Sequence, residues 1–325
     1  MSAPFVSVSD LHKTYPVSRG LFGEKKLLRA VAGISFDIPE GSTFGLVGES
    51  GSGKTTAAKM VMGAESPSAG VVKIAGRDIA THSKAEMSAF RRLLQPVLQD
   101  PYSSLSPRMR IGRIIDEPLR IHRLGSKHER RERVEHLLDR VGLPASAALR
   151  FPNELSGGQR QRVAIARALS PEPRCIVLDE PVSALDVSIQ AQILNLLKDL
   201  QQKLGLTFLL ISHDLAVVSF MSTQIGVMYL GRLVEIGSKK SILADARHPY
   251  TLALMSAASP DAPIAPVRGE IPSPLAPPSG CAFHTRCPLA QDRCRIESPA
   301  LRPMGPDHRV ACHFSETSRT ELQHA

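Results

Sequence analysis

The chain has 325 residues, of which 42% are hydrophobic, and it carries a formal net charge of +9. Its length permits one large domain or two. It has no run of about 18 apolar residues, and it does not begin with a basic segment followed by an apolar one. The sequence therefore predicts neither a membrane span nor a secretory signal, so any work at a membrane would be done through partners.

The positive charge lies in residues 1–240, because residues 241–325 hold eight Lys or Arg and eight Asp or Glu. A basic face suits nucleic acid, but it suits ATP or an anionic membrane surface equally well. Only 4% of the residues are aromatic, which is poor material for stacking on bases. We therefore expect no nucleic-acid partner. Five cysteines, an odd number, favour a reducing compartment over a disulfide framework.

The first clear pattern along the chain is extended. Apolar residues in segments 5–8 and 31–38 predict an antiparallel sheet within residues 5–40. Residues 16–27 are interpreted as an insertion in this pattern. A short apolar run at 43–47 is typical of a buried strand, and residues 57–62 have the composition of a helix.

The segment between that strand and that helix matches the phosphate-binding pattern G-x-x-x-x-G-K-[ST]. Its glycines let successive N–H groups point at phosphate oxygens, and a helix N-terminus adds partial positive charge. Lys54 is expected to reach the outer phosphates, and Thr55 to give its hydroxyl to Mg²⁺. A glycine-rich turn with a chance lysine is the alternative, and the flanking strand and helix argue against it. The predicted nucleotide-binding residues of this loop are Gly48, Ser50, Gly51, Ser52, Gly53, Lys54, Thr55 and Thr56.

Residues 85–165 are rich in helical patterns. One helix is predicted from about His128, with an apolar stripe at Val134, Leu137, Leu138 and Val141. Gly142 and Pro144 are expected to end it. Stripes of this kind normally pack into a core, and they carry no functional claim.

Two acidic residues follow a short apolar run, residues 175–178, which is typical of a buried parallel strand. The carboxyl ends of such strands are where α/β sheets bind ligands. Asp179 suits the Mg²⁺ shell, and Glu180 suits a base that activates water. A solvated acidic turn is the alternative interpretation, and the phosphate loop elsewhere in the chain argues against it.

Further elements complete the first 240 residues. A long amphipathic helix is predicted after Asp186, and a strand at 207–212 leads directly into His213. This histidine is interpreted as a group that binds a γ-phosphate oxygen and fixes the attacking water, with a structural role as the alternative. Residues 224–237 predict two strands joined at Gly231.

The composition changes near residue 258. Twelve of the 25 prolines and four of the five cysteines lie after residue 240, and residues 259–279 predict a Pro-rich strap without helix. Four thiolates in a segment with little core can hold an iron–sulfur cluster. Zinc is the second option, although zinc sites usually begin with closely spaced cysteine pairs, and reduced small apolar side chains are the third. The four residues are Cys281, Cys287, Cys294 and Cys312.

Taken together, these residues resemble the ATP-binding subunit of an ABC transporter. The family's signature sequence LSGGQ stands here as Leu155, Ser156, Gly157, Gly158 and Gln159. The resemblance implies that Gln99 is the Q-loop glutamine, which contacts Mg²⁺ and the attacking water, and that Asp186 belongs to the D-loop. It also implies that Tyr15 stacks on adenine, with Phe22 as a competitor.

The resemblance implies an α/β fold with a P-loop NTPase (RecA-like) core, an antiparallel β subdomain and a helical subdomain at about 85–165. It places the ATP-binding cassette in residues 1–240 and a Pro/Cys-rich extension in residues 241–325. Residues 99–108, 180–190 and 248–251 are similar to segments of oligopeptide, dipeptide and nickel importers. Segment 281–288, Cys-x-Phe-x-x-Arg-Cys-Pro, is similar to tails thought to hold a [4Fe–4S] cluster.

The activity implied is hydrolysis of Mg²⁺–ATP that drives uptake of di- or oligopeptides. The implied partners are a second ATP-binding subunit, whose ATP the signature residues serve, two transmembrane permease subunits and an extracytoplasmic substrate-binding protein. The chain would lie peripherally at the cytoplasmic face of the inner membrane. Nickel as cargo, a soluble ABC ATPase of translation or repair, and a redox-sensing regulator built on the tail cysteines are the alternatives.

Overall fold

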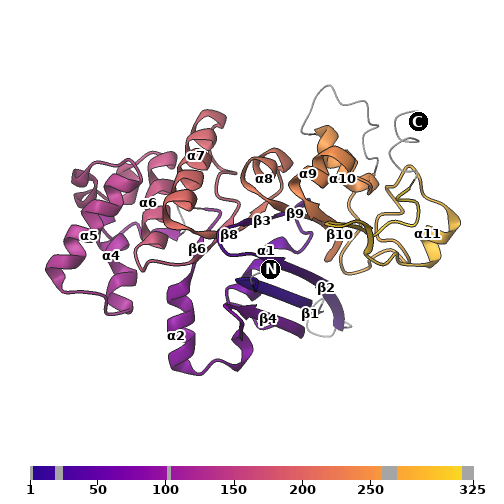
Figure 1. The fold of residues 1–325 in the computed structure, drawn as a ribbon, viewed down its shortest axis with the longest axis horizontal. Helices are drawn as coiled ribbons and strands as arrows, with labels where there is room; N and C mark the ends of the chain where they lie inside the picture. Colours follow the sequence, from indigo (N-terminus) through magenta and orange to yellow (C-terminus); the bar gives the residue numbers. More distant parts are fainter. Residues whose placement is uncertain (1–2, 19–24, 101–103, 258–268, 317–325) are drawn as a thin grey trace. The chain divides into compact units, whose positions relative to one another are not determined.

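The computed structural model describes residues 3–18, 25–100, 104–257 and 269–316 (Figure 1). The chain divides into two compact units, and each is described by itself. The first unit comprises Met1–Phe5, Ile38–Ser42 and Ile74–Leu210. The second comprises Val6–Asp37, Thr43–Lys73 and Ile211–Ala325.

The first unit contains a pair of parallel strands and most of the longer helices. Strands β6 (Leu94–Val97) and β7 (Cys175–Asp179) pair in parallel, with Val97 opposite Leu178. Strand β8 (Thr207–Ser212) begins in this unit, and every one of its residues is buried. The unbroken apolar run in β7 and β8 is what strands covered on both faces require.

In the first unit, α4 (Ile111–Ile121) packs on α5 (Lys127–Arg140) and α6 (Gly157–Leu169). Ser126 begins α5 with a capping box that includes Glu129, as a helix start in a charged sequence needs. The remaining elements of this unit are β5 (Arg77–Asp78), η1 (Ile79–Thr81), α2 (Lys84–Leu93), η2 (Ala145–Leu149), η3 (Pro152–Glu154) and α7 (Val187–Leu204).

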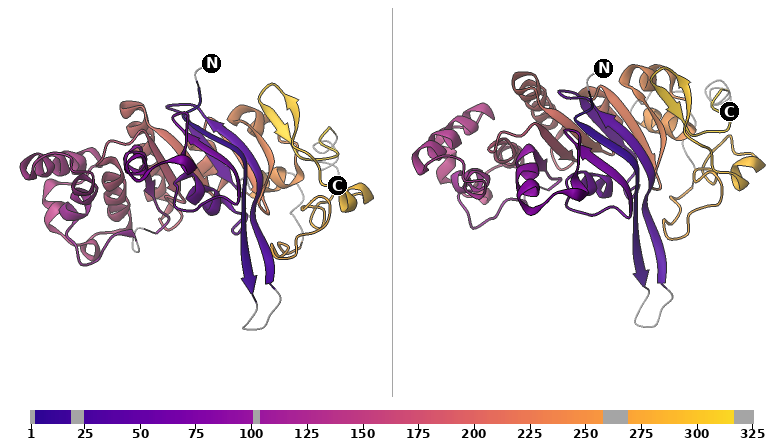
Figure 2. Two further views of the ribbon diagram at one scale, coloured as in Figure 1. Left: turned by 90° about the horizontal axis from the view of Figure 1, so that it is seen from below. Right: turned by 60° about the horizontal axis from the view of Figure 1, so that its bottom comes forward.

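The second unit contains two sheets. Strands β1 (Val6–Ser18) and β2 (Lys25–Ile38) are neighbours and form the long ribbon in Figure 2, with β4 (Ala69–Ile74) beside β1. The ends of the expected insertion, residues 16–18 and 25–27, belong to these two strands.

The other sheet of the second unit joins the predicted core to the C-terminal segment. Strand β3 (Thr43–Val47) pairs in parallel with β9 (Gln224–Tyr229), and β9 pairs antiparallel with β10 (Arg232–Ser238), confirming the hairpin at Gly231. The strand that lies beyond β10 in this sheet comes from the C-terminal segment and not from the predicted core. Strand β12 (His308–Val310) pairs antiparallel with β10, and β11 (Arg302–Gly305) pairs with β12.

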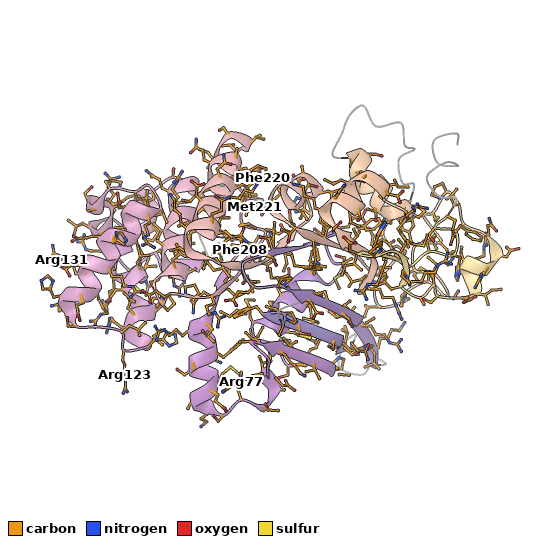
Figure 3. All side chains as sticks on the ribbon, in the orientation of Figure 1. Arg77, Arg123, Arg131, Phe208, Phe220 and Met221 are labelled. Carbon is orange, nitrogen blue, oxygen red and sulfur yellow. The ribbon has the colours of Figure 1, made fainter. Side chains whose placement is uncertain are left out.

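The helices of the second unit are α1 (Lys54–Val61), α8 (Leu215–Met221), α9 (Lys239–Asp245), α10 (Pro249–Ala257) and α11 (Asp292–Ile296). Helix α8 is amphipathic, with Phe220 exposed and its neighbour Met221 buried (Figure 3). No helix in the described part of the chain is long and apolar enough to cross a membrane. The described part of the predicted Pro-rich strap, residues 269–279, has no helix, as expected.

Candidate active site

The phosphate loop connects β3 to α1, in the strand–loop–helix arrangement that the sequence predicts. Helix α1 begins at Lys54, and its N-cap Gly53 has a φ of 103°. A Cβ at Gly53 would lie 2.1 Å from the Ala30 carbonyl oxygen, so both the backbone conformation and the space require glycine. No described side chain caps this helix start, which leaves a partly positive N-terminus at the loop.

Lys54 is held within the loop. Its Nζ donates to the carbonyl oxygens of Gly48 at 2.6 Å and Glu49 at 2.8 Å, and to Ser52 Oγ at 3.3 Å. The side chain is buried, while Thr55, the next residue, is exposed. A cationic group and a hydroxyl thus lie at one helix start, which is the chemistry that binds phosphate and Mg²⁺.

Two further candidates lie in the second unit. His213 is exposed and follows β8 directly, where Asp214 caps α8 by accepting from the Ala216 N–H at 2.7 Å. Tyr15 is half-buried in β1, and Lys13 Nζ lies 5.0 Å from its ring centroid. Phe22, the competing aromatic, lies outside the described residues.

The acidic pair closes β7 in the first unit. Asp179 is the last residue of the strand and is buried, and Glu180 has a φ of 47°, a conformation uncommon for residues other than glycine. Gln99 donates from Nε2 to Glu180 Oε2 at 3.0 Å, although the two residues are 81 positions apart. Both residues follow the carboxyl ends of neighbouring parallel strands, and this explains their proximity.

The signature residues form the start of α6. The helix begins at Gly157, because Ser156 caps it. Ser156 Oγ accepts from the Gln159 N–H at 3.3 Å, and Gln159 Oε1 accepts from the Ser156 N–H at 3.0 Å. Since its oxygen acts as the acceptor in this cap, the Ser156 hydroxyl proton is a donor that the cap does not use.

The signature glycines lie against the segment after the acidic pair. A Cβ at Gly158 would lie 2.6 Å from Ile189 Cγ2, and one at Gly157 would lie 3.3 Å from Leu185. Leu155 is buried, and Asp186 is exposed at the N-cap position of α7. The structure therefore brings the signature residues and the D-loop together.

The second unit contains two loop contacts that our sequence analysis did not identify. Glu49 of the phosphate loop donates its N–H to Tyr250 Oη at 2.7 Å, and its carboxylate accepts two hydrogen bonds from Arg286. These partners lie 201 and 237 residues away. The only sequence signal was the position of Arg286 inside the cysteine-containing segment 281–288.

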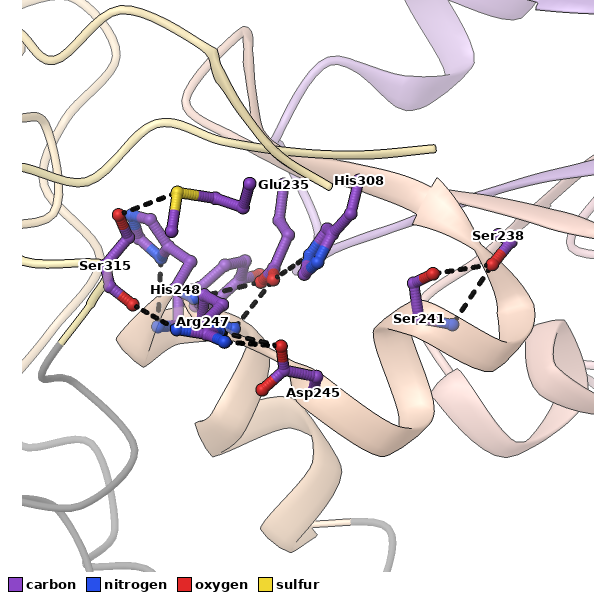
Figure 4. Close-up of polar contacts among 10 residues, drawn as sticks. Glu235, Ser238, Ser241, Asp245, Arg247, His248, His308 and Ser315 are labelled. Atoms are coloured by element: carbon purple, nitrogen blue, oxygen red, sulfur yellow. Dashed lines mark hydrogen bonds and ion pairs between the residues drawn. The ribbon is translucent and has the colours of Figure 1, made fainter. Parts of the chain in front are cut away.

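The C-terminal segment is anchored to the sheet by a buried carboxylate. Glu235 of β10 contacts His308 Nε2 at 2.7 Å and accepts from the N–H groups of Arg247 at 2.7 Å and His248 at 3.0 Å (Figure 4). Its side chain is fully buried. A buried carboxylate without such partners would be costly, so this network fixes β12 and the start of α10 to β10.

The described residues do not support the predicted metal site of the tail. In the described part of the chain, no group of three or more His, Cys, Asp and Glu is placed so that it could hold a metal ion. Burial raises the pKa of Cys287 to about 12 and that of Cys312 to about 11, and charge on neighbouring cysteines acts in the same direction.

The phosphate loop, the parallel strands and the acidic pair define a P-loop nucleotide-binding fold, and comparisons with known proteins specify the family. Residues 31–183 match the family model described as "ABC transporter", and residues 234–294 match "Oligopeptide/dipeptide transporter, C-terminal region".

Relatives match over nearly the whole chain. The probable peptide ABC transporter ATP-binding protein y4tS of Sinorhizobium fredii is 50% identical over 96% of this chain and 90% of that protein. The di/tripeptide transport ATP-binding protein DppF of Pseudomonas aeruginosa is 47% identical over 96% of this chain and 98% of its own. The oligopeptide transport ATP-binding protein AppF of Bacillus subtilis is 45% identical over 95% and 97%.

Solved structures agree on the fold. The ATP-binding cassette MJ0796, a dimer in a post-hydrolysis state with ADP and Pi, is 31% identical and superposes with a TM-score of 0.64 over 72% of this chain and 98% of its own. CbiO1 from Clostridium perfringens, part of an ABC transporter complex, is 26% identical with a TM-score of 0.65 over 80% and 97%. The chain belongs to the ABC transporter family, as an ATP-hydrolysing subunit with the oligopeptide/dipeptide transporter C-terminal region.

Proposed function

We propose that this chain binds and hydrolyses ATP to drive import of di- or oligopeptides across the cytoplasmic membrane. The observation that supports the cargo is the match of residues 234–294 to the oligopeptide/dipeptide C-terminal region, together with near full-length relatives named for peptide transport. We place the ATP-binding cassette in residues 1–240 and the extension in residues 241–325.

Within the site we assign roles by chemistry. Lys54 binds the outer phosphates, and Thr55 and Asp179 supply the hydroxyl and carboxylate oxygens that Mg²⁺ prefers. Bound Mg²⁺ would neutralise charge on the phosphates. Glu180 takes the proton of the attacking water. Gln99 donates to the Glu180 carboxylate at 3.0 Å and orients that carboxylate.

The remaining candidates act around this centre. His213 contacts the γ-phosphate and Tyr15 stacks on adenine. Ser156 and the N-terminus of α6 bind the ATP held by a second ATP-binding subunit, with Asp186 at the same junction. Hydrolysis therefore requires two subunits to close on the nucleotide, and loss of the γ-phosphate releases them.

The partners in this proposal are a second ATP-binding subunit, either the same chain or a sister, two permease subunits and an extracytoplasmic peptide-binding protein. The chain would lie at the cytoplasmic face of the inner membrane. A groove of about 820 Å³ among α4, α5 and η2, lined by arginines that include Arg131, is the surface that we assign to the permease.

The permease assignment has a matched pair of variants. Arg131 lines the groove, whereas Arg123 is exposed in the turn between α4 and α5 and is not a lining residue. Both side chains are labelled in Figure 3. Arg131→Glu should reduce recovery of permease subunits with the tagged chain, and Arg123→Glu should not. Equal recovery for both variants would place the contact elsewhere.

The function is tested by purifying the tagged chain from detergent-extracted membranes and reconstituting the complex in liposomes. We expect permease subunits to co-purify and peptide with its binding protein to stimulate ATP hydrolysis. In the Glu180→Gln variant the subunits should still co-purify, and the stimulated hydrolysis should be almost lost. Stimulation by nickel instead of peptide would change the cargo. A chain that purifies without membrane subunits would support the soluble ATPase.

The iron–sulfur cluster has no part in this mechanism, because no described group of side chains is arranged to hold it. It stays a prediction of the tail sequence. Elemental analysis of anaerobically purified protein decides it. About four irons per chain would support a cluster, zinc would support the second option, and neither metal would leave four unligated thiols.

A further inference from the structure

The C-terminal segment contacts the phosphate loop through a fork of two hydrogen bonds. Arg286 Nη1 donates to Glu49 Oε2 at 2.7 Å, and Nη2 donates to Oε1 at 2.9 Å. The Arg286 side chain is 8% exposed and that of Glu49 is 28% exposed. Paired, partly desolvated contacts of this geometry are stronger than ordinary surface ion pairs.

Every polar group of Glu49 has a partner within the second unit. Its N–H donates to Tyr250 Oη at 2.7 Å, and its carbonyl oxygen accepts from Lys54 Nζ at 2.8 Å and from the Ser52 N–H at 3.2 Å. Glu49 therefore connects the C-terminal segment to the lysine that binds phosphate. A shift of Glu49 would move an acceptor of Lys54.

An aromatic cluster holds the tail residues in place. Tyr229, Tyr250 and Phe283 are each 1% exposed. Their ring centroids lie 4.8 Å apart for Tyr229 and Tyr250, 5.2 Å for Tyr229 and Phe283, and 5.4 Å for Tyr250 and Phe283. The Arg286 guanidinium carbon lies 5.9 Å from the rings of both Tyr229 and Phe283. Because the rings of Tyr229 and Phe283 flank it, the guanidinium is preorganised for the carboxylate.

The charge balance gives this contact a function. Glu49 is a carboxylate in a loop that must bind the negatively charged phosphates of ATP, and an unpaired charge there would repel them. Arg286 neutralises it from within the fold, and the carboxylate in turn holds the pKa of Arg286 above its usual range. Tyr250 fixes the backbone of the same residue.

We propose that Arg286 is a positioning residue of the nucleotide site, which neutralises Glu49 and thereby makes the C-terminal segment part of the machinery that binds ATP. This inference rests on ATP binding by the proposed phosphate loop. The alternative is that the pair only attaches the tail, in which case neutralising Glu49 by mutation would not restore affinity in an Arg286 variant.

The experiment is equilibrium binding of radiolabelled ATP with Mg²⁺ to the full purified chain. Arg286→Ala should raise the Kd about tenfold, and the increase should shrink in high salt, because screening weakens repulsion. Arg286→Lys keeps the charge and should stay within about threefold of wild type. Glu49→Gln in the Arg286→Ala background should restore the Kd to within about threefold.

Two controls keep the outcomes distinct. Arg293→Ala removes an arginine of the same segment that pairs with Glu297 and is 59% exposed, and it should leave the Kd unchanged. Glu49→Gln alone should bind ATP at least as tightly as wild type, even if Arg286→Ala fails to fold. The inference would be overturned by an unchanged Kd in a folded Arg286→Ala variant. It would also be overturned if Glu49→Gln alone bound ATP more weakly than wild type. Wild-type protein that does not bind ATP would overturn the proposed function instead.

Discussion

The chain contains two glycine-rich helix starts, and they are stabilised in different ways. At α6, the cap comes from Ser156 and Gln159, three positions apart in the sequence. At α1, no described side chain caps the helix, and the preceding loop depends on Tyr250 and Arg286, more than 200 residues away. The signature end is therefore specified locally, whereas the phosphate loop needs the C-terminal segment to be folded.

This difference fits the two roles proposed for the helix starts. A loop that binds the subunit's own ATP can be tied to distant parts of the same chain, and its affinity then reports on their folding. An end that serves a partner's ATP must be complete before the partner arrives. The predictions below test this comparison in order of decreasing effect.

The largest effect is expected from Glu180→Gln, which keeps the shape of the side chain and removes the base. Turnover in the assembled transporter should fall by a factor of about 10² to 10⁴, with ATP binding retained. Steady-state release of phosphate measures it. Glu172→Gln is the control, because its carboxylate pairs with Arg133 and is 68% exposed. Turnover within about threefold of wild type would remove Glu180 from the mechanism.

Lys54→Ala should weaken ATP binding to the isolated subunit by more than about tenfold, because it removes the charge held at the loop. Lys59→Ala, on the exposed side of the same helix, provides the control. Binding of labelled ATP is the measurement. If both variants bind as tightly as wild type, the loop has been assigned wrongly.

Ser156→Ala should lower ATPase activity of the assembled transporter by about tenfold, because the hydroxyl that we assign to the partner's ATP is lost. Loss of the cap alone costs about 1 kcal/mol of helix stability. Ser126→Ala isolates that cost, since Ser126 has the same capping box at α5. Similar ATPase activity in Ser156→Ala and Ser126→Ala would show that Ser156 only caps its helix.

The last prediction concerns pH and the tail that supports the phosphate loop. Burial lowers the pKa of His248 from 6.5 to about 3, and its Nδ1 accepts from the Tyr250 N–H. The unfolded chain therefore binds a proton near pH 6.5 that the folded chain refuses until about pH 3. The free energy of unfolding should fall with acidification across this window, by at most about 1.4 kcal/mol per pH unit for this group.

His248→Asn keeps an acceptor for Tyr250 and removes the titrating group. Its unfolding free energy, measured by urea denaturation from pH 7 to pH 4, should decline less steeply than that of wild type. Parallel pH profiles for the two proteins would show that another group governs the acid sensitivity.

The elements that depend on nearby residues were predictable from the sequence. Strand β8 occupies the predicted residues 207–212, and α7 follows Asp186 because its apolar stripe has helical spacing. The start of α6 likewise depends on nearby residues, because its cap joins Ser156 and Gln159, three positions apart.

The features that depend on distant residues were not predictable. Strand β12 joins the sheet through its pairing with β10, about 70 residues earlier in the chain. The strand has only three residues, and so short a segment cannot be distinguished from a loop by its sequence pattern. The contact between Arg286 and Glu49 spans 237 residues, and neither side chain is unusual in its local sequence. The candidate site could be proposed from the sequence where it consists of a motif of glycine, lysine and acidic residues, and not where it depends on tertiary packing.

The most direct test of the account compares the two helix starts in one isolated subunit. Equilibrium binding of ATP should weaken by more than about tenfold in Lys54→Ala and stay within about twofold of wild type in Ser156→Ala, because only the phosphate loop binds the subunit's own nucleotide. An equal loss of affinity in the two variants would contradict the division of roles between the two ends.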